Sequence, residues 1–426
     1  MDNTMQNQKI DDFFDQLNPI KKVSLPKERK NIAIFFASIN FKYFAGNLKY
    51  LFLEFVKKNY ECYFLTTFQE IYNLLKSKGL PVIKYDPKDL SLEDFNTIIS
   101  SKYMFLDHDF DFARVDKNLF FMLNDKVKFQ LWHCIATKNT NENQIHIKDI
   151  KSNFNSLYSG RKSNDYILSL KNQEEITYKD NYFEPKVKFI NSPPSKVDSL
   201  KEKHDEYELL NVDLDNYRLI KEKYKKKEFN IIYCPTYRPY DYTVDTIFNE
   251  NKWFQHLDFE LLDNFCLKNN INFFMNTHQS DTVHFCKYVE DLKFKKIKII
   301  KEYSDIYPLL YFTNALITDY SSIYSDYIKL KKPIIFFRPD KKKFENEVGI
   351  YKDNILSCGQ EVIQIQSLLD LILEIKVSKN DYLKKFNSQI NEALSFFSLD
   401  NPVSNSSIVL RSLQNIIELK KIKHVK

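Results

Sequence analysis

Glycine is scarce in this sequence: the 426 residues include only 5, and they are widely separated. Walker loops and dinucleotide-binding turns need two or three glycines close together, because the backbone must approach the phosphate closely. No stretch of this chain can form either turn, so a bound phosphate must be held in some other way. The glycines are Gly46, Gly79, Gly160, Gly349 and Gly359.

Cysteine pairs, a secretion signal and membrane-spanning runs are lacking as well. The 6 cysteines are scattered without a C-x-x-C pair, and most lie inside apolar runs, where a buried free thiol is expected. The first residues are polar and acidic, which excludes a signal peptide, and no apolar run reaches about 18 residues. We therefore expect a cytoplasmic protein that can lie at the inner face of the cell membrane but does not cross it.

The excess of positive charge is small, +6 at pH 7, but the lysines are clustered. Each cluster alone is typical of a solvated surface, whereas several together favour anionic partners such as phosphorylated substrates, phosphate-rich polymers or an anionic membrane surface. Nucleic acid would also suit the charge, but no nucleic-acid-binding signature is present, so we expect none as a partner. The clusters are Lys221–Lys227, Lys293–Lys301, Lys329–Lys332 and Lys420–Lys426.

Apolar runs alternate with amphipathic stretches along most of the chain. Continuous apolar runs separated by helices predict parallel strands that are buried on both faces of a sheet. A first series of runs lies at 31–38, 61–66, 81–85, 102–107, 128–133, 166–170 and 186–190. After a pause that begins with NSPPSK, a second series lies at 229–236, 271–278, 297–301, 315–318 and 333–337, and residues 361–421 have a helical pattern.

This pattern predicts an α/β protein with two Rossmann-like domains that face a central cleft, followed by C-terminal helices. In such sheets ligands bind at the carboxyl ends of the strands. The predicted segments are an N-terminal extension at 1–30, a Rossmann-like domain at 31–195, a linker or helical segment at 196–229, a second Rossmann-like domain at 230–375 and C-terminal helices at 376–426.

Polar side chains lie where three of the predicted strands end. His133 closes KFQLWH and His278 closes INFFMNTH. Either could be an interior imidazole bonded to a carbonyl, but equivalent positions in two domains favour a functional role, since a base must reach a cleft. The third strand end carries Pro235-Thr236-Tyr237-Arg238. A surface arginine is the ordinary alternative there, yet a guanidinium at a cleft suits bidentate phosphate binding.

The most specific strand end is ALIT followed by Asp319-Tyr320-Ser321-Ser322. Ile323, Tyr327 and Leu330 have helical spacing, so a helix begins at these serines. An ordinary serine N-cap is one interpretation. In the other, free amides, the helix dipole and two hydroxyls converge on a bound anion without any glycine.

A metal site is not predicted. His108 lies beside Asp107, Asp109 and Asp111 in LDHDFDF, but neighbouring residues on an extended chain point in opposite directions. A polar loop is the expected structure there. The histidines outside this segment and the strand ends have no partners at a spacing typical of metal ligands.

In this order, the segments resemble the CDP-glycerol glycerophosphotransferase family, which includes teichoic acid primases and polymerases and related capsule polymerases. The resemblance covers roughly residues 31–375, and its most specific part surrounds the Asp-Tyr-Ser-Ser motif. It is carried by Gly46-Asn47-Leu48-Lys49-Tyr50-Leu51, Leu131-Trp132-His133 with Lys138, Pro235-Thr236-Tyr237-Arg238, His278, Ser304-Asp305 through Leu309-Leu310, Leu316 through Ser322, Lys332 through Phe337, and Gly349-Ile350-Tyr351.

The resemblance implies a GT-B-type fold, with an acceptor domain first and a CDP-donor domain second. It implies transfer of glycerol phosphate, or a similar polyol phosphate, from CDP-glycerol or a related CDP-polyol to a hydroxyl of a teichoic acid- or capsule-like polymer, with release of CMP. The acceptor would be a polyol phosphate or saccharide that can be lipid-linked, and no cofactor would be tightly bound. His133 would be the general base and His278 a second catalytic residue. The substrate-binding residues implied are Arg238, Thr236, Asp305, Asp319, Ser321, Ser322 and Lys138.

Three positions depart from the family pattern. The family usually has a glycine after the first histidine, a lysine two residues before the second and a proline after it, where this chain has Cys134, Asn276 and Gln279. These departures support one rival hypothesis, a non-catalytic subunit that binds anionic polymer and releases no nucleotide. The other rival is a sugar-nucleotide glycosyltransferase of the same fold, which would release UDP or GDP instead of CMP.

Overall fold

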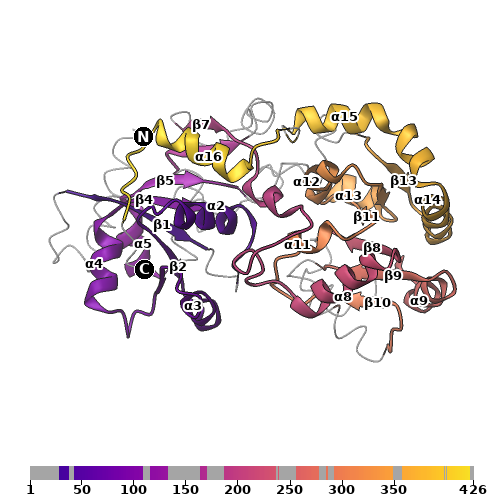
Figure 1. The fold of residues 1–426 in the computed structure, drawn as a ribbon, viewed down its shortest axis with the longest axis horizontal. Helices are drawn as coiled ribbons and strands as arrows, with labels where there is room; N and C mark the ends of the chain where they lie inside the picture. Colours follow the sequence, from indigo (N-terminus) through magenta and orange to yellow (C-terminus); the bar gives the residue numbers. More distant parts are fainter. Residues whose placement is uncertain are drawn as a thin grey trace, which may run out of the picture. The chain divides into compact units, whose positions relative to one another are not determined.

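The computed structural model divides into two compact units, and each is described by itself (Figure 1). Unit 1 contains Met1–His133, Asn143–Ser192 and Ser406–Lys426, and unit 2 contains Cys134–Glu142 and Pro193–Asn405. The segment boundaries expected from the sequence remain a prediction. The structure describes residues 28–37, 43–108, 116–132, 164–169, 187–236, 238, 256–277, 285, 292–348, 357–397, 399 and 401–422.

Unit 1 is built on a seven-stranded parallel sheet with the order β3-β2-β1-β4-β5-β6-β7. The chain starts in the middle, moves outward to β3, and returns to place β4 on the other side of β1. The strands are β1 Lys30–Phe36, β2 Cys62–Thr66, β3 Val82–Lys84, β4 Ser101–Leu106, β5 Val127–Gln130, β6 Tyr166–Ser169 and β7 Lys188–Asn191. The helices are α2 Gly46–Lys57, α3 Gln69–Lys76, α4 Leu92–Ser100, α5 Lys117–Asn124 and α16 Asn405–Gln414. The first residue of α16, Asn405, belongs to unit 2, and the rest of that helix belongs to unit 1.

An aromatic ladder covers one face of the unit 1 sheet. Rings on four neighbouring strands stack with successive centroids 4.8, 4.9 and 4.7 Å apart: Phe35, Phe105, Phe129 and Tyr166. Cross-strand aromatic pairs of this kind contribute on the order of 1 kcal/mol each beyond their buried area. Phe52 of α2 packs edge-on against Phe35 at 5.4 Å, so the ladder also anchors the helix that follows β1.

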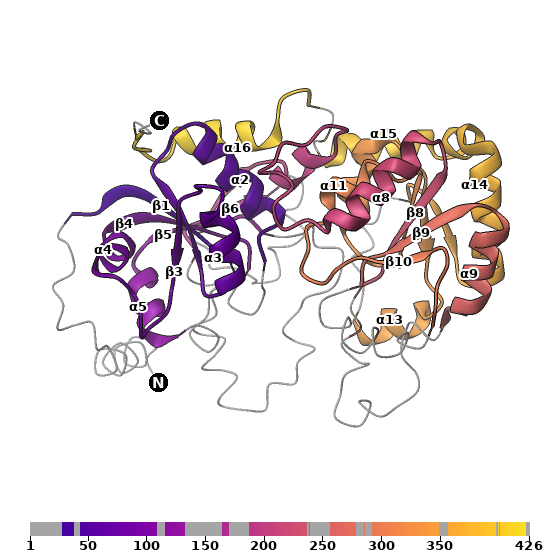
Figure 2. The ribbon, with the colours of Figure 1, turned by 60° about the horizontal axis from the view of Figure 1, so that its bottom comes forward.

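The opposite face of this sheet packs against α4 and α5. Because successive side chains of a strand alternate between faces, Ile34 and Phe36 turn away from the aromatic ladder and join Ile98 and Leu119 in a separate core cluster. Figure 2 shows α4 and α5 on one side of the sheet and α2 and α3 on the other. Burial of both faces explains why the strand sequences are continuously apolar.

Unit 2 is built on a six-stranded parallel sheet with the order β10-β9-β8-β11-β12-β13. Its strands are β8 Phe229–Cys234, β9 Ile271–Met275, β10 Ile297–Ile299, β11 Ala315–Thr318, β12 Ile334–Phe337 and β13 Gln360–Val362. Its helices are α8 Leu214–Lys225, α9 Phe259–Lys268, α11 Tyr307–Leu310, α12 Ile323–Tyr327, α13 Lys341–Glu347, α14 Ile365–Lys385 and α15 Asn387–Phe396, with 3₁₀ turns η3 Ser195–Ser199 and η6 Ile328–Leu330.

The two faces of the unit 2 sheet are also covered by different helices. Tyr233 of β8 lies in one core cluster with Leu262 of α9 and Leu368 of α14. On the other face, the amide of Asn230 donates to the carbonyl of Ile220 in α8 at 3.2 Å. Figure 2 shows the same division, with α9 and α14 on one side of the strands and α8 and α11 on the other.

The fold class predicted from the sequence is confirmed: the protein is α/β, with two Rossmann-like units and C-terminal helices. All the predicted strands are present, although KFQLWH leaves the sheet at Gln130 rather than at its histidine. One strand was missed, because β13 lies where the helical pattern was expected to begin. It pairs with β12 at the sheet edge, and its sequence QEV has only one apolar residue, so it lacks the apolar run that marked the other strands.

Gly359 lies against the backbone of β12, and its substitution tests this close approach. A Cβ at Gly359 would lie 2.1 Å from the carbonyl oxygen of Ile334, whereas Gly79 has open space around it and φ of +67°. We expect Gly359→Ala to lower the free energy of unfolding by about 3 kcal/mol, because backbone must move. The control Gly79→Ala should lose about 1 kcal/mol from left-handed strain alone. Urea unfolding followed by circular dichroism measures both, and equal losses would contradict the packing.

Candidate functional site

The carboxyl ends of β8, β11 and β12 lie side by side at one edge of the unit 2 sheet. From β8 the chain moves outward to β9 and β10, whereas from β11 it moves in the other direction to β12 and β13. The chain direction therefore switches between β8 and β11, which is where open α/β sheets bind their ligands. The loops that leave this edge begin at Pro235, Asp319 and Arg338.

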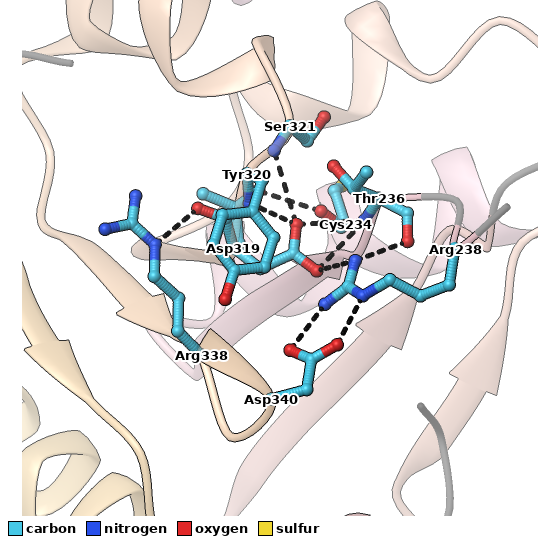
Figure 3. Close-up of polar contacts among 9 residues, drawn as sticks. Cys234, Thr236, Arg238, Asp319, Tyr320, Ser321, Arg338 and Asp340 are labelled. Carbon is cyan, nitrogen blue, oxygen red and sulfur yellow. Dashed lines mark hydrogen bonds and ion pairs between the residues drawn. The ribbon is translucent and has the colours of Figure 1, made fainter. Parts of the chain in front are cut away.

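The carboxylate of Asp319 forms hydrogen bonds with the backbone of two of these loops. Asp319 is fully buried, and its Oδ1 accepts the backbone N–H of Thr236 at 2.9 Å and that of Tyr320 at 2.5 Å. The N–H of Ser321 donates to the same oxygen at 3.3 Å. A buried carboxylate is stable only when its charge is balanced and its oxygens are hydrogen-bonded. Asp319 therefore holds the starts of both loops in one arrangement (Figure 3).

Arg238 provides the balancing positive charge. Its side chain is only 2% exposed, and its Nη1 lies 2.9 Å from Oδ2 of Asp319. Its Nε and Nη2 donate to the two carboxylate oxygens of Asp340 at 2.7 and 3.1 Å, and Nη1 donates to the carbonyl of Thr236 at 2.7 Å. Because the planar guanidinium matches a carboxylate in a bidentate pair, this one side chain joins the loops that follow β8, β11 and β12 (Figure 3).

A second arginine, Arg338, directly follows β12 and contacts the loop after β11 and strand β13. Its Nε donates to the backbone carbonyl of Asp319 at 3.0 Å, and its Nη1 donates to the Glu361 carboxylate of β13 at 2.7 Å. The guanidinium carbons of Arg238 and Arg338 lie 4.9 and 5.2 Å from the ring centroid of Tyr320. Both distances allow cation–π attraction, so Tyr320 contributes to holding the two arginines.

Burial determines the protonation of the groups around this network. It raises the pKa of the Tyr320 phenol and of the Cys234 thiol well above their ordinary values, so both are neutral at physiological pH. Burial also raises the pKa of the Glu361 carboxyl, but hydrogen bonds from Lys341 and Arg338 outweigh it, and the net shift is downward. The lowered pKa keeps Glu361 ionised beside its two cations, and Cys234 provides no thiolate nucleophile.

Hydroxyl groups lie beside this network. Thr236 is 2% exposed, and its Oγ1 has no hydrogen-bond partner among the described residues. Ser321 lies close to it, because the N–H groups of both residues donate to the same carboxylate. Ser322 is the N-cap residue of α12, yet its side chain makes no capping hydrogen bond. Buried hydroxyls normally have a partner, so the Thr236 hydroxyl is an exception among the described residues.

A second buried polar cluster holds α12. The Asp326 carboxylate lies 2.8 Å from Nζ of Lys196 and accepts the hydroxyl of Tyr307 at 2.7 Å, and the side chains of the ion pair are 3% and 6% exposed. Lys196 belongs to η3, in the segment that the sequence suggested as a linker. Asp305 is 1% exposed, and its Oδ1 accepts the backbone N–H of Tyr307 at 3.1 Å. The described contacts of Asp305 therefore support the turn into α11.

The structure places six of the nine predicted site residues. Thr236, Arg238, Asp319 and Ser321 lie together at the sheet edge, Ser322 follows at the start of α12, and Asp305 lies in the second cluster. Direct contact of any of them with substrate stays a prediction. His133, His278 and Lys138 lie outside the described residues.

Asp340 and Arg338 are site residues that the sequence reasoning missed. Both directly follow the strand that ends at Phe337, so the strand-end signal that identified the other loops was present here too. Neither residue type was expected to be buried, because isolated charged residues after a strand usually face solvent. Their importance appears only through partners that lie far along the chain, such as Arg238, which is 102 residues from Asp340.

One expectation for unit 1 was wrong. Asp107 and His108 were expected to point in opposite directions, but the chain bends after β4, and Oδ1 of Asp107 lies 2.6 Å from Nδ1 of His108. Within the described ranges, no group of three or more His, Cys, Asp or Glu side chains could hold a metal ion.

Two parallel sheets and C-terminal helices define a GT-B-type α/β protein. A solved structure of the wall teichoic acid polymerase TagF matches with a TM-score of 0.64 at 18% identity, over 95% of this chain and 92% of that chain. The structure of a variant of that polymerase soaked with CDPG gives a TM-score of 0.66 at 16% identity, over 93% and 92%. At these identities the likeness establishes the fold.

Sequence comparison identifies the family. The profile of the family described as CDP-Glycerol:Poly(glycerophosphate) glycerophosphotransferase matches residues 20–409, a range that includes every strand of both sheets. The chain belongs to this family, and the resemblance inferred from the motifs is confirmed.

Two curated relatives are similar over part of their length. A teichoic acid glycerol-phosphate transferase of Staphylococcus aureus (strain NCTC 8325 / PS 47) is 24% identical over 60% of this chain and 64% of its own. A teichoic acid poly(glycerol phosphate) polymerase of Bacillus spizizenii (strain ATCC 23059 / NRRL B-14472 / W23) is 30% identical over 41% of this chain and 39% of its own. The matched region thus spans less than two thirds of either relative.

Asp340 provides a test of the buried network. Its side chain is 6% exposed, whereas that of Glu361, which pairs with Arg338, is 33% exposed. We expect Asp340→Asn to lower the free energy of unfolding by about 3–5 kcal/mol, because the buried guanidinium of Arg238 loses half of its counter-charge. The control Glu361→Gln should lose about 1 kcal/mol, as partly exposed pairs do. Chemical unfolding of both variants measures the difference, and a small loss in Asp340→Asn would disprove the assigned role.

Proposed function

We propose that this protein transfers glycerol phosphate, or a similar polyol phosphate, from a CDP-activated donor to a hydroxyl of a cell-surface polymer and releases CMP. Membership of the glycerophosphotransferase family supports the reaction class. The names of the relatives, a teichoic acid glycerol-phosphate transferase and a teichoic acid polymerase, support a teichoic acid-like acceptor. The structural observation that carries the proposal is the buried Thr236 hydroxyl beside Ser321 at the switch point of unit 2.

The donor diphosphate is proposed to bind the hydroxyls of Thr236, Ser321 and Ser322. Hydroxyl groups donate to phosphate oxygens from a strand end without a glycine-rich turn, which suits a chain with 5 glycines. A hydrogen bond to a charged group contributes roughly 1.5–3 kcal/mol, so three of them can hold a diphosphate firmly. Binding at this edge also follows the general position of ligands on open α/β sheets.

Arg238 is proposed to serve the donor site indirectly. Its described hydrogen bonds go to the carboxylates of Asp319 and Asp340 and to the carbonyl of Thr236, rather than into open space. One carboxylate is enough to offset its single positive charge, and two lie against it, so it adds little positive field at the phosphate. We therefore expect Arg238 to hold Thr236 in position, while the imidazole of His278 supplies positive charge to the diphosphate.

The proposed reaction is a direct phosphoryl transfer. The acceptor hydroxyl oxygen forms a bond to the β-phosphorus of the donor, the bond from that phosphorus to the bridging oxygen breaks, and CMP leaves with the electron pair. The hydroxyl proton passes to His133 as general base, a step that contributes on the order of 10²–10⁴-fold to the rate. Fixed hydroxyls and His278 would stabilise the charge on the transferring group.

The cellular location of the reaction is proposed from the clusters of positive charge. None of the described helices combines the length and apolarity that a membrane crossing requires. We propose that the protein acts in the cytoplasm at the inner face of the cell membrane, where a lipid-linked acceptor would be presented. The basic segment Lys221–Lys227 on and after α8 supports contact with an anionic lipid surface or polymer.

A donor panel tests the reaction class. The protein is incubated with CDP-glycerol, CDP-ribitol, UDP-glucose and GDP-mannose together with a polyol-phosphate acceptor, and the released nucleotide is identified by chromatography. We expect CMP from a CDP-polyol and no UDP or GDP, because the transferred group carries the β-phosphate with it. Release of UDP or GDP would favour the glycosyltransferase. Acceptor binding without any nucleotide release would favour the non-catalytic subunit.

Substitution of Thr236 by valine tests the donor site. Thr236→Val removes a hydroxyl that has no partner among the described residues, so the fold should be unaffected. We expect KM for the CDP donor to rise roughly tenfold to a hundredfold through loss of a hydrogen bond to a charged group. The matched control is Thr318→Val, whose hydroxyl donates to the carbonyl of Cys234 at 2.8 Å. It should lose stability but keep its KM, and an unchanged KM in Thr236→Val would refute the donor contact.

A further inference from the structure

Trp132 in unit 1 has an unusual backbone conformation for its residue type. Its φ is +50°, in the left-handed region that bulky residues rarely occupy. Among the other left-handed non-glycine residues that the structure describes, four follow the ends of helices, where this conformation is common: Asn59, Lys227, Asn270 and Lys331. Trp132 instead lies two residues after β5. Strained residues of this kind persist only when their surroundings hold them, and they cluster at functional sites.

Gln130 holds the N–H group of Trp132. The Gln130 side chain is completely buried at the end of β5, and its Oε1 accepts the Trp132 N–H at 3.1 Å. Its Nε2 donates to the backbone carbonyl of His108 at 3.0 Å, just after β4. One amide therefore ties together the chain segments that leave β4 and β5.

Asn47 holds the carbonyl of the same residue. It is the second residue of α2 and is 7% exposed, and its Nδ2 donates to the Trp132 carbonyl at 2.7 Å and to the Leu131 carbonyl at 3.4 Å. Gly46, directly before it, has φ of +65°, and a Cβ there would lie 3.3 Å from the hydroxyl of Tyr43. A glycine at this position therefore lets the chain turn sharply into α2.

The carbonyl that Asn47 binds belongs to the peptide joining Trp132 to His133. Gln130 binds the backbone N–H and Asn47 the backbone carbonyl of Trp132, the residue that precedes the proposed base. Strands β1 and β4, whose following segments supply Asn47 and the His108 carbonyl, are the neighbours between which the unit 1 chain reverses direction. The hydrogen bonds of Asn47 and Gln130 thus lie at the unit 1 switch point.

We propose that Asn47 and Gln130 are positioning residues for the transfer reaction, because they fix the backbone of Trp132, the residue that directly precedes His133 in the chain. The inference rests on the proposed function, in which His133 is the general base. A base must lie within about 3 Å of the proton that it removes, and a displacement of about 1 Å can cost a hundredfold in rate. The hydrogen bonds that Gln130 and Asn47 form with the Trp132 backbone supply this positional accuracy, because without them Trp132 would relax to an ordinary conformation.

Asn47→Ala tests this inference in the full-length protein with CDP-glycerol and a polyol-phosphate acceptor. We expect kcat to fall tenfold to a hundredfold while KM and Kd for CDP-glycerol change less than twofold, because the donor is proposed to bind unit 2. The control Thr66→Val removes another buried side-chain bond at a strand end of the same sheet, 3.1 Å to the N–H of Phe68, and should keep wild-type kcat. Gln130→Met keeps the side-chain length but loses both hydrogen bonds, and it should reproduce the loss if Asn47→Ala does not fold.

The His133→Ala background separates positioning from general structural support. If Asn47 acts through the imidazole, the double variant Asn47→Ala/His133→Ala should be within twofold of His133→Ala, because residues that act as a unit are not additive. A full additional loss in that background, or wild-type kcat in Asn47→Ala and Gln130→Met, would overturn the inference while leaving the function intact. Near-wild-type turnover in His133→Ala would instead overturn the base assignment, and the inference with it.

Discussion

The buried carboxylate of Asp319 is the interaction on which the unit 2 site depends. A charge removed from water must be paired and hydrogen-bonded, and Asp319 meets this requirement with the N–H groups of two loops and with the guanidinium of Arg238. Arg238 also forms a bidentate pair with Asp340, so the same group of charges holds the loop after β12. The strand-end loops are therefore held by one group of ion-paired and hydrogen-bonded side chains.

This network is the setting of the proposed diphosphate site in a chain with few glycines. In glycine-rich turns the backbone itself approaches the ligand, whereas here the backbone N–H groups of Thr236 and Ser321 already donate to Asp319. In the proposed function, side-chain hydroxyls contact the diphosphate instead, and the buried Thr236 hydroxyl is one of them. Unit 1 shows a related arrangement, since buried amide side chains hold the strained backbone of Trp132. In both units, polar side chains hold the loops that leave the switch point.

Much of the fold could be predicted from the sequence, because strands and helices leave a pattern in adjacent residues. Strands such as β8 and β11 are continuous apolar runs because both faces of each sheet are covered by helices. The Asp319-Tyr320-Ser321-Ser322 motif was visible because it directly follows such a run. The edge strand β13 was missed, since only one of its three residues is apolar. The buried ion pair of Lys196 with Asp326 was missed because Lys196 lies in an apparent linker.

The sequence by itself determined the order of strands and helices, the family and the strand ends where chemistry was to be sought, because these depend on residues that are adjacent in the chain. Only the tertiary structure decided which charged groups pair. The sequence placed Arg238 at a strand end but did not indicate that its guanidinium binds Asp340, 102 residues away. Likewise, nothing near Trp132 in the chain indicated that Asn47, 85 residues earlier, would hold its carbonyl. Such partners meet because parallel strands bring distant loops to the same sheet edge, and no local pattern records that meeting.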